Sequence, residues 1–295
     1  MSVRYGFIQA QQADYPIERL CRVMGVARSG YYAWLKADKT PREMANQHLV
    51  QEIRAIHRES RGTYGCPRIH AELRARGQLC TRKRVARLMR LDDLRGLRKG
   101  HKHLSTTDSR HRNPIAPNLL QQDFHATAPN QKWTADITYI PTDAGWLYLA
   151  VVLDLYSRRI VGWAMAPQMR QSLVLDALNM ALVRRQPSAD LIHHSDRGSQ
   201  YTACAYQECL RHYHIQPSMS RKGNCYDNAP TESFFATLKA EILPHPFASH
   251  RLARSVIFDF IEVWYNRRRR HSALGFRSPH DFELFHSSSL STKTG

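Results

Sequence analysis

The sequence predicts small all-α modules in its first hundred residues and an α/β domain with a mixed sheet in the remainder. Three observations carry this prediction. Apolar residues recur at helical spacing in residues 16–36 and 41–99. Three runs rich in β-branched and aromatic residues follow between Lys132 and Met165. Helix-like and strand-like segments then alternate, and strands in a hairpin followed by such alternation are typical of a mixed α/β sandwich.

Two short helices are expected in residues 16–36, on either side of a turn at Gly25. Leu20 belongs to the apolar stripe of the first helix, and Tyr31 and Trp34 belong to that of the second. Two short helices joined by a glycine turn fit a helix-turn-helix as well as a plain helical hairpin, and the pattern alone favours neither.

Residues 41–99 predict further helices, the last of them strongly basic. Thr81 is suited to cap this helix, and Val85 and Leu88 would point inward. Its outward face carries five cations: Arg82, Lys83, Arg84, Arg87 and Arg90. A solvated face is one explanation, but five cations on one helix favour contact with DNA or RNA.

The helical periodicity fails over residues 101–130, where three prolines fall in a polar stretch, so we expect a linker there. After the third strand we expect a helix in residues 171–185 and a strand ending near Ser195. A further helix and strand follow, then a helix from Pro230 and a last long helix over residues 250–270. The predicted parts are 1–38 and 41–100 (helix-turn-helix-like), 101–130 (linker), 131–286 (α/β domain) and 287–295 (disordered tail).

The chain is strongly basic, which restricts the class of its partner. Its formal net charge is +18, of which +13 falls in residues 1–130. Such a charge indicates a polyanion, although a ribosomal or RNA-binding protein would share it. No apolar run approaches the roughly 20 residues that cross a bilayer, and no secretion signal begins the chain. Six cysteines without a CxxC pair are expected to be reduced thiols of a cytoplasmic protein.

Three acidic residues lie at positions of the predicted fold that suggest a function. Asp136 lies within the first strand, Asp196 at the carboxyl end of the fourth, and Glu232 in the first turn of a helix. Each has an ordinary explanation: a solvated strand face, a helix cap, or an acid near a helix dipole. In a basic chain, three converging carboxylates suit Mg²⁺, because this ion prefers oxygen ligands. Two such ions roughly 4 Å apart can assist an in-line displacement at a phosphodiester.

Several blocks of sequence resemble one known family. "WTADITYI", "HSDRGSQY" and "NAPTESFFATLK", with 35 residues between Asp196 and Glu232, resemble the three signature blocks of DDE transposases and retroviral-type integrases. The tail "YNRRRRHSALGFRSP" resembles a signature of the second-frame transposases of bacterial insertion sequence family three. "GTYGCPRIHAEL" is similar to the helix-turn-helix module of that group. The resemblance covers residues 16–285.

The resemblance implies a ribonuclease-H-like fold for the α/β domain. It implies that Asp136, Asp196 and Glu232 hold two Mg²⁺ ions, with Mn²⁺ able to substitute. The implied chemistry is hydrolysis at an element end, followed by attack of the freed 3′-OH on another strand of double-stranded DNA. Lys239, seven residues after Glu232, resembles a lysine that contacts the element end, although an exposed charge is equally compatible with its position.

The tail signature is matched at Tyr265, Asn266, Arg269, His271 and Leu274. The resemblance favours contact of Arg267, Arg269 and His271 with the DNA backbone, against the alternative of a solvated helix end. It also implies a homo-oligomer on DNA and an upstream-frame protein that is fused to this chain or partners it.

Other notable residues are expected to take no part in the metal-dependent chemistry. His193 and His194 suggest zinc, but no cysteine lies nearby, and alternation points them to opposite faces of a strand, so at most one is expected near the acids. Asp154, on the second strand, has no matching role and is expected to be structural.

Two other functions remain open. A DNA-binding regulator of transposition would use the N-terminal helices without catalysis, and the presence of all three acids argues against it. A ribonuclease-H-like nuclease would share the metal site but would not need two upstream helix-turn-helix modules.

Overall fold

The computed structural model describes residues 2–36, 40–97, 113–243 and 245–291. The chain forms two compact units, Met1–Ala55 and Ile56–Gly295. Residues 101–112 of the predicted linker and 292–295 of the predicted tail lie outside the described residues. Within the described ranges, no helix has both the length and the apolar character needed to span a membrane.

The first unit contains the two predicted short helices and one helix that was not predicted. Gly25 ends the first of the predicted helices in the left-handed region, with φ of 62°, a conformation that favours glycine. The additional helix supplies Ile8, which is buried with Leu20 and Tyr31. Gly30 allows the close contact between helices, because a Cβ there would lie 2.6 Å from the hydroxyl of Tyr5. The helices are α1 (Ser2–Gln11), α2 (Ile17–Met24) and α3 (Arg28–Lys36).

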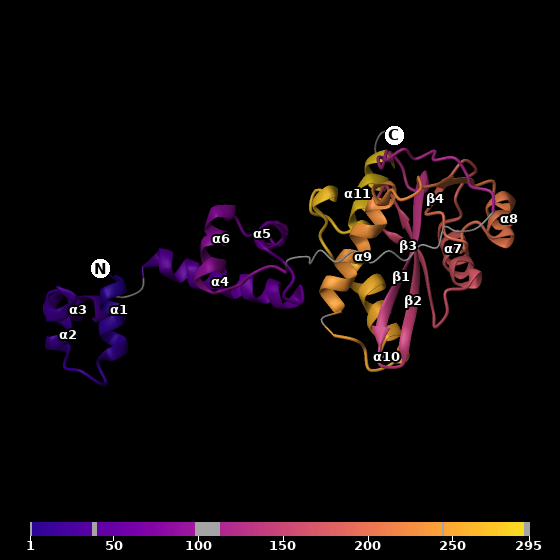
Figure 1. Cartoon of the computed structure of the whole chain (residues 1–295). Helices are drawn as coiled ribbons and strands as arrows, with labels where there is room; N and C mark the ends of the chain where they lie inside the picture. The colour runs from indigo at the N-terminus through magenta and orange to yellow at the C-terminus, as the bar shows by residue number, and fades with distance from the viewer. Residues whose placement is uncertain (1, 37–39, 98–112, 244, 292–295) are drawn as a thin grey trace. The chain divides into compact units, whose positions relative to one another are not determined.

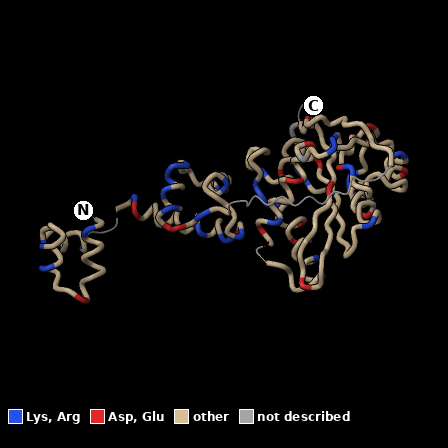
Figure 2. Tube along the Cα trace, in the orientation of Figure 1, with Lys and Arg blue, Asp and Glu red and all other residues tan. Residues whose placement is uncertain are grey.

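Three more helices follow, and the last is the basic helix predicted from the sequence. The Oγ1 of Thr81 caps it by accepting a hydrogen bond from the backbone N–H of Arg84 at 3.3 Å. Val85, Ile69 and Leu73 are fully buried. Figure 2 shows several Lys and Arg positions, in blue, along this part of the chain. The helices are α4 (Pro41–Glu59), α5 (Cys66–Ala75) and α6 (Arg82–Leu91).

A five-stranded mixed sheet forms the centre of the remaining chain, as predicted. Its strand order is β3-β2-β1-β4-β5. The first three strands pair antiparallel as a meander, whereas β4 runs parallel to β1 and β5 runs parallel to β4. The strands are β1 (Lys132–Thr142), β2 (Gly145–Asp154), β3 (Ile160–Ala166), β4 (Ile192–Ser195) and β5 (Gln216–Met219).

Helices cover both faces of this sheet (Figure 1). On one face, α7 (Gln171–Arg185) and α8 (Cys204–His212) cover an apolar core that includes Trp133 and Leu178. Gly162 of β3 allows α7 to pack closely, because a Cβ there would lie 2.1 Å from the carbonyl oxygen of Ala177. On the other face lie α9 (Ala229–Ile242) and α10 (His250–Phe258).

The described part of the predicted linker belongs to the α/β domain. Residues 113–131 form no regular element before β1, but they pack on the sheet. Leu120 is buried, and the backbone N–H of Leu119 donates to the Oγ of Ser218 at 2.9 Å. The linker prediction is therefore wrong for these residues, because lack of periodicity does not exclude tertiary contacts.

The C-terminal region differs from the single long helix that was predicted. After α10, the chain widens into a π-helical segment, η2 (Asp259–Tyr265), and leaves the helix at Asn266. The side chain of Asn266 pairs with the backbone of Ile160: its Oδ1 accepts from the N–H at 3.0 Å, and its Nδ2 donates to the carbonyl at 2.9 Å. A short 3₁₀ turn, η3 (Ser272–Leu274), precedes α11 (Pro279–Ser291), which continues past the predicted boundary at residue 286.

Candidate active site

Asp136 and Glu232 are held near each other by contacts between β1 and α9. The hydroxyl groups of Thr134 and Thr231 lie 2.6 Å apart in a buried hydrogen bond. The Nδ2 of Asn228 donates at 3.1 Å to the carbonyl oxygen of the residue that precedes Asp136. Thr231 directly precedes Glu232, and the accepting carbonyl directly precedes Asp136. The two contacts therefore fix the start of α9 against β1 at the position of Asp136.

Asp196 follows directly after β4, beside β1. The parallel register pairs Thr134 with His194, which brings the end of β4 close to Asp136. The backbone N–H of Gly198 donates to the Oδ1 of Asp196 at 2.8 Å. A Cβ at position 198 would lie 3.0 Å from that oxygen, so a glycine allows the chain to fold closely over the carboxylate.

The loop before α9 is anchored by a charged residue that was not predicted. Asp227 accepts hydrogen bonds from the guanidinium of Arg221 and from the side-chain amides of Asn118 and Gln122. The hydrogen bond from Arg221 is the main cause that holds the pKa of Asp227 well below its ordinary value. The anchored loop leads directly to Glu232, so this network positions the third acid.

The three acids act on one another electrostatically. The pKa of Asp136 is raised well above its ordinary value, first by burial and then by the negative charges of Asp196 and Glu232. A hydrogen bond from the N–H of Ile137, at 2.7 Å, and the positive charge of Lys239 oppose this rise. Because both other carboxylates act on Asp136, the structure brings all three predicted acids into one site.

The donor set at this site suits a hard divalent cation. All three side chains offer carboxylate oxygens, which Mg²⁺ and Mn²⁺ prefer over nitrogen or sulfur ligands. Among the described residues, no group of three or more Asp, Glu, His or Cys side chains could hold a metal ion as arranged, so the three acids would have to move closer together to bind one. Carboxylates without a cation between them repel one another, and a bound cation would remove the repulsion that raises the pKa of Asp136.

Lys239 lies close enough to Asp136 to act on it electrostatically. It is seven residues after Glu232 on α9, so the two side chains share a helix face. Its Nζ lies 4.4 Å from the ring centroid of Tyr139. Burial lowers the pKa of Lys239, and the negative charge of Asp136 opposes this shift. The site therefore combines three acids with one half-buried cation.

Comparison with known proteins identifies the family. Integrase core domain families match residues 126–225 and 213–279, and an HTH-like domain family matches residues 44–102. Transposase InsF for insertion sequence IS3A of Escherichia coli (strain K12) is 46% identical over 285 residues, covering 95% of this chain and 98% of that protein.

The chain belongs to the IS3 family of transposases.

Two further similarities accompany this result. The insertion element IS600 uncharacterized 31 kDa protein of Shigella sonnei is 49% identical over 269 residues, covering 90% of this transposase and 98% of that protein. The HTLV-2 integrase catalytic core domain, solved in complex with magnesium, has a TM-score of 0.41 and 14% identity, covering 54% of this chain and 99% of that one.

The two histidines before Asp196 are buried on opposite faces of the transposase's β4, as predicted. The Nε2 of His193 lies 2.5 Å from the hydroxyl of Tyr206 on α8, whereas His194 lies within 3.0 Å of the hydroxyls of Ser218 and Ser220. Burial lowers the pKa of His193 to about 3 and that of His194 to about 4. Both rings are therefore neutral parts of the interior at neutral pH.

We expect His193 to make the stability of the transposase depend on pH. Its folded-state pKa lies below the ordinary value of 6.5, so the unfolded chain binds the proton first as pH falls. The stabilisation is complete above about pH 6.5 and is lost progressively below it. Urea denaturation between pH 7.5 and 4.5 would measure the loss.

The matched variants for this test are His193→Phe, which removes the buried group, and His212→Phe, which removes an exposed histidine on α8. His193→Phe should reduce the slope of stability against pH, with the remaining slope due in part to buried His194, and His212→Phe should leave the slope unchanged. An equal slope in all three proteins would contradict the expectation.

The tail signature is largely structural, and the expectation for Arg269 is wrong. The Nε and Nη2 of Arg269 lie 2.9 and 2.8 Å from the Oε1 of Glu241 on α9. The two side chains are only 5% and 4% exposed, so this guanidinium cannot reach a DNA phosphate in this structure. Arg267 is exposed, and His271 is half-buried, with its ring edge-on to Tyr265 at a centroid distance of 4.7 Å.

Arg270, which was not among the predicted residues, connects the tail with α5. Its Nε pairs with a carboxylate oxygen of Glu72, and its backbone N–H donates to the hydroxyl of Tyr64 at 2.7 Å. Arg68 also donates to the backbone carbonyl of Arg270 at 2.9 Å. These contacts give part of the arginine run a structural role.

The basic face of α6 remains available for DNA. Arg82, Lys83 and Arg87 are exposed, and Arg84 is half-buried.

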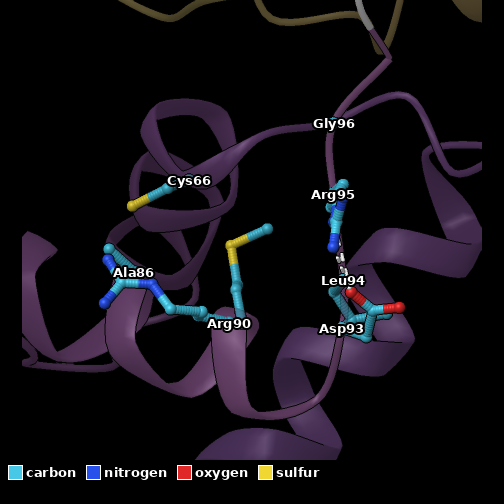
Figure 3. A pocket seen from close by; sticks show the side chains of 8 residues that line it. Cys66, Ala86, Arg90, Asp93, Leu94, Arg95 and Gly96 are labelled. Carbon is cyan, nitrogen blue, oxygen red and sulfur yellow. Dashed lines mark hydrogen bonds and ion pairs between the residues drawn. The ribbon is translucent and has the colours of Figure 1, made fainter.

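A hollow of about 240 Å³ adjoins α6 and is lined by Cys66 among others (Figure 3). The hollow contains no cluster of acids: it shows one carboxylate, paired with a neighbouring arginine, and burial raises the pKa of the thiol. It therefore offers no alternative to the three-acid site.

Proposed function

We propose that this transposase cleaves phosphodiester bonds at the ends of its insertion element and joins the freed 3′-OH to target DNA. The observation that supports the proposal is the electrostatic contact among Asp136 on β1, Asp196 directly after β4 and Glu232 on α9: burial, and then the negative charges of the other two acids, raise the pKa of Asp136. Three carboxylates in a strongly basic chain provide what metal-assisted phosphoryl chemistry needs.

Asp136, Asp196 and Glu232 would hold the metal, and we propose two Mg²⁺ ions, with Mn²⁺ able to replace them. Bound Mg²⁺ supplies positive charge for the phosphate and for its attacking and leaving oxygens. The hydrogen bonds of Asn228 and Thr231 keep the carboxylates aligned before DNA arrives. Such preorganisation lowers the cost of assembling the site during the reaction.

The partner we propose is double-stranded DNA, both element end and target. Arg82, Lys83 and Arg87 offer exposed cations on α6, and Arg84 lies partly exposed beside them. Lys239, whose Nζ lies over the ring of Tyr139, would meet a phosphate or base next to the acids. A homo-oligomer on DNA, an upstream-frame partner protein and a cytoplasmic location complete the proposal.

Removing one cation from α6 should weaken DNA binding without changing its sequence preference. Arg87→Ala is expected to lower affinity for all duplexes alike and to reduce the slope of log K against log salt by about 1. Arg211→Ala removes an exposed cation from α8 and serves as the control. Equal slopes for Arg87→Ala and the unmodified protein would exclude a phosphate contact by Arg87.

The proposed function is tested with a labelled element-end duplex, a target plasmid and Mg²⁺. Cleavage at the element end followed by covalent joining to the plasmid is the expected result. Binding without cleavage, in this chain and in a fusion with its upstream frame, would favour a regulator. Cleavage without joining would favour a nuclease.

A further inference from the structure

We infer that Tyr139, Trp146 and Lys239 form a stacking site for an unpaired nucleobase of the DNA strand at the three acids. This inference rests on the proposed function for the identity of the DNA, but its geometry is independent of the chemistry. The three residues come from β1, β2 and α9 respectively.

The two aromatic residues form one surface on the β1–β2 hairpin. The register pairs Tyr139 with Tyr148 and Pro141 with Trp146, so Tyr139 and Trp146 lie diagonally on the same face of the sheet. Their ring centroids are 4.9 Å apart with an interplanar angle of 82°. Trp146 is 52% exposed, so a large part of its ring is open to a ligand.

The positively charged side chain of Lys239 contacts the aromatic pair. The Nζ of Lys239 lies over the ring of Tyr139 at 4.4 Å from the centroid. A cation on one aromatic ring, next to a second, exposed ring, is the combination that binds single-stranded nucleic acid: the rings stack with bases while the cation attracts the backbone. A single exposed aromatic residue would be ordinary on a protein surface, whereas this pair shares a cation with the acidic site.

Lys239 connects the stacking site with the acids. Tyr139 is three residues after Asp136 on β1, so the two side chains leave the strand on opposite faces, about 10 Å apart along it. Lys239, on the α9 face that carries Glu232, acts electrostatically on Asp136 and also lies over the ring of Tyr139. A base near the phosphate at the acids would reach the rings at the position of this lysine.

On the side of β4, the described pairings leave an interval of β1 without a partner strand. β4 pairs with Lys132 to Thr134, and the next described backbone pairing on this edge joins Thr142 to Phe247. Asp136 and Tyr139, both partly exposed, fall in the interval between these two pairings. The proposed DNA strand would pass over this interval, with its phosphate at Asp136 and its base on the rings.

The stacking chemistry also sets the class of ligand. Every nucleobase has a π-face, so stacking tolerates different sequences, whereas a paired base inside a duplex cannot offer that face. We therefore expect preference for element ends whose terminal bases are unpaired, and weak dependence on which base is present.

The test uses the full chain carrying Asp196→Asn and element-end DNA with 5-iodouracil placed singly at positions around the cleavage site. After irradiation, mass spectrometry identifies the cross-linked peptide. Cross-links to Trp146 or Tyr139 from one or two adjacent positions are the expected result. Cross-links that map only to other aromatic residues would overturn the inference.

A binding measurement supports the cross-linking with matched variants. Trp146→Ala should weaken affinity for an end with unpaired terminal bases about tenfold, and Trp146→Phe should restore most of the loss. Tyr213→Ala, an exposed aromatic residue after α8, is the control. Equal losses in Trp146→Ala and Tyr213→Ala, or failure of Trp146→Phe to rescue a folded protein, would overturn the inference.

The two proposals can fail separately. If the unmodified protein does not cleave DNA but Trp146 still cross-links, the proposed function fails and the stacking site stands. If cleavage and joining occur but Trp146→Ala binds and reacts like the unmodified protein, the stacking site fails and the proposed function stands.

Discussion

Replacing Asp136, Asp196 or Glu232 with its amide is expected to abolish both cleavage and joining while leaving DNA binding nearly intact. Each amide keeps the size of the side chain but removes the negative charge that would hold the metal. A metal contributes several kcal/mol to the stabilisation of charge in the transition state, so we expect a loss of about 10³-fold or more for each variant. Gel analysis of labelled element ends measures both steps.

Asp176→Asn is the matched control, because Asp176 is an exposed carboxylate on α7, on the opposite face of the sheet from α9. Its activity should equal that of the unmodified protein. Binding of each variant to the same duplex separates lost chemistry from lost affinity. If Glu232→Gln cleaves like Asp176→Asn, the third acid is wrongly assigned.

Breaking the buried ion pair between Arg269 and Glu241 is expected to destabilise the fold strongly. Both side chains are almost fully buried, and Glu241 also accepts a hydrogen bond from the indole of Trp264 at 2.9 Å. Removing one partner leaves an uncompensated charge in the interior, which costs about 3–5 kcal/mol in the free energy of unfolding. We expect this loss for Arg269→Ala, measured by urea denaturation.

Arg267→Ala provides the comparison, because this neighbouring arginine is exposed. Its free energy of unfolding should change by less than about 0.5 kcal/mol. The double variant Arg269→Met/Glu241→Leu should recover much of the stability, because an apolar pair replaces the ion pair without leaving a charge. If Arg269→Ala keeps its stability, the buried ion pair does not stabilise the fold and the structural role of Arg269 is contradicted.

The tail shows what a sequence pattern can and cannot predict. Four consecutive arginines indicate a charged surface, and Arg267 and Arg268 are indeed exposed. The partner of Arg269 lies 28 residues earlier in the chain, and that of Arg270 lies 198 residues earlier. Local charge density contains no information about partners at such distances, so the structural role of these two residues could not be predicted.

The strands and acids were easier to predict than the contacts that position them. Runs of β-branched residues located β1 to β3, and the spacing of Asp196 and Glu232 matched a known family. The hydrogen bond between Thr134 and Thr231 spans 97 residues, and neither threonine differs in the sequence from an ordinary surface threonine. The motif around Glu232 was recognised, but the role of Asn228 became clear only from the fold.

Two segments were mispredicted because their local pattern is weak. Residues 113–131 have no periodicity, yet Leu120 is buried by contacts with a strand nearly one hundred residues later. The helix α1 is short, and its C-terminal part is rich in glutamine, so its sequence shows no clear apolar stripe. The burial of Ile8 in the core was therefore not predicted. In both segments tertiary packing, rather than propensity, determines the structure.

The central claim is that Asp136, Asp196 and Glu232 form one metal site. Anomalous diffraction from crystals of the transposase soaked in Mn²⁺ tests it most directly, because the ion can be located without any assumption about the reaction. The account predicts anomalous density within coordinating distance of the carboxylates of Asp136 and Asp196, and its loss in Asp136→Asn. Density located elsewhere, or unchanged density in Asp136→Asn, would contradict it.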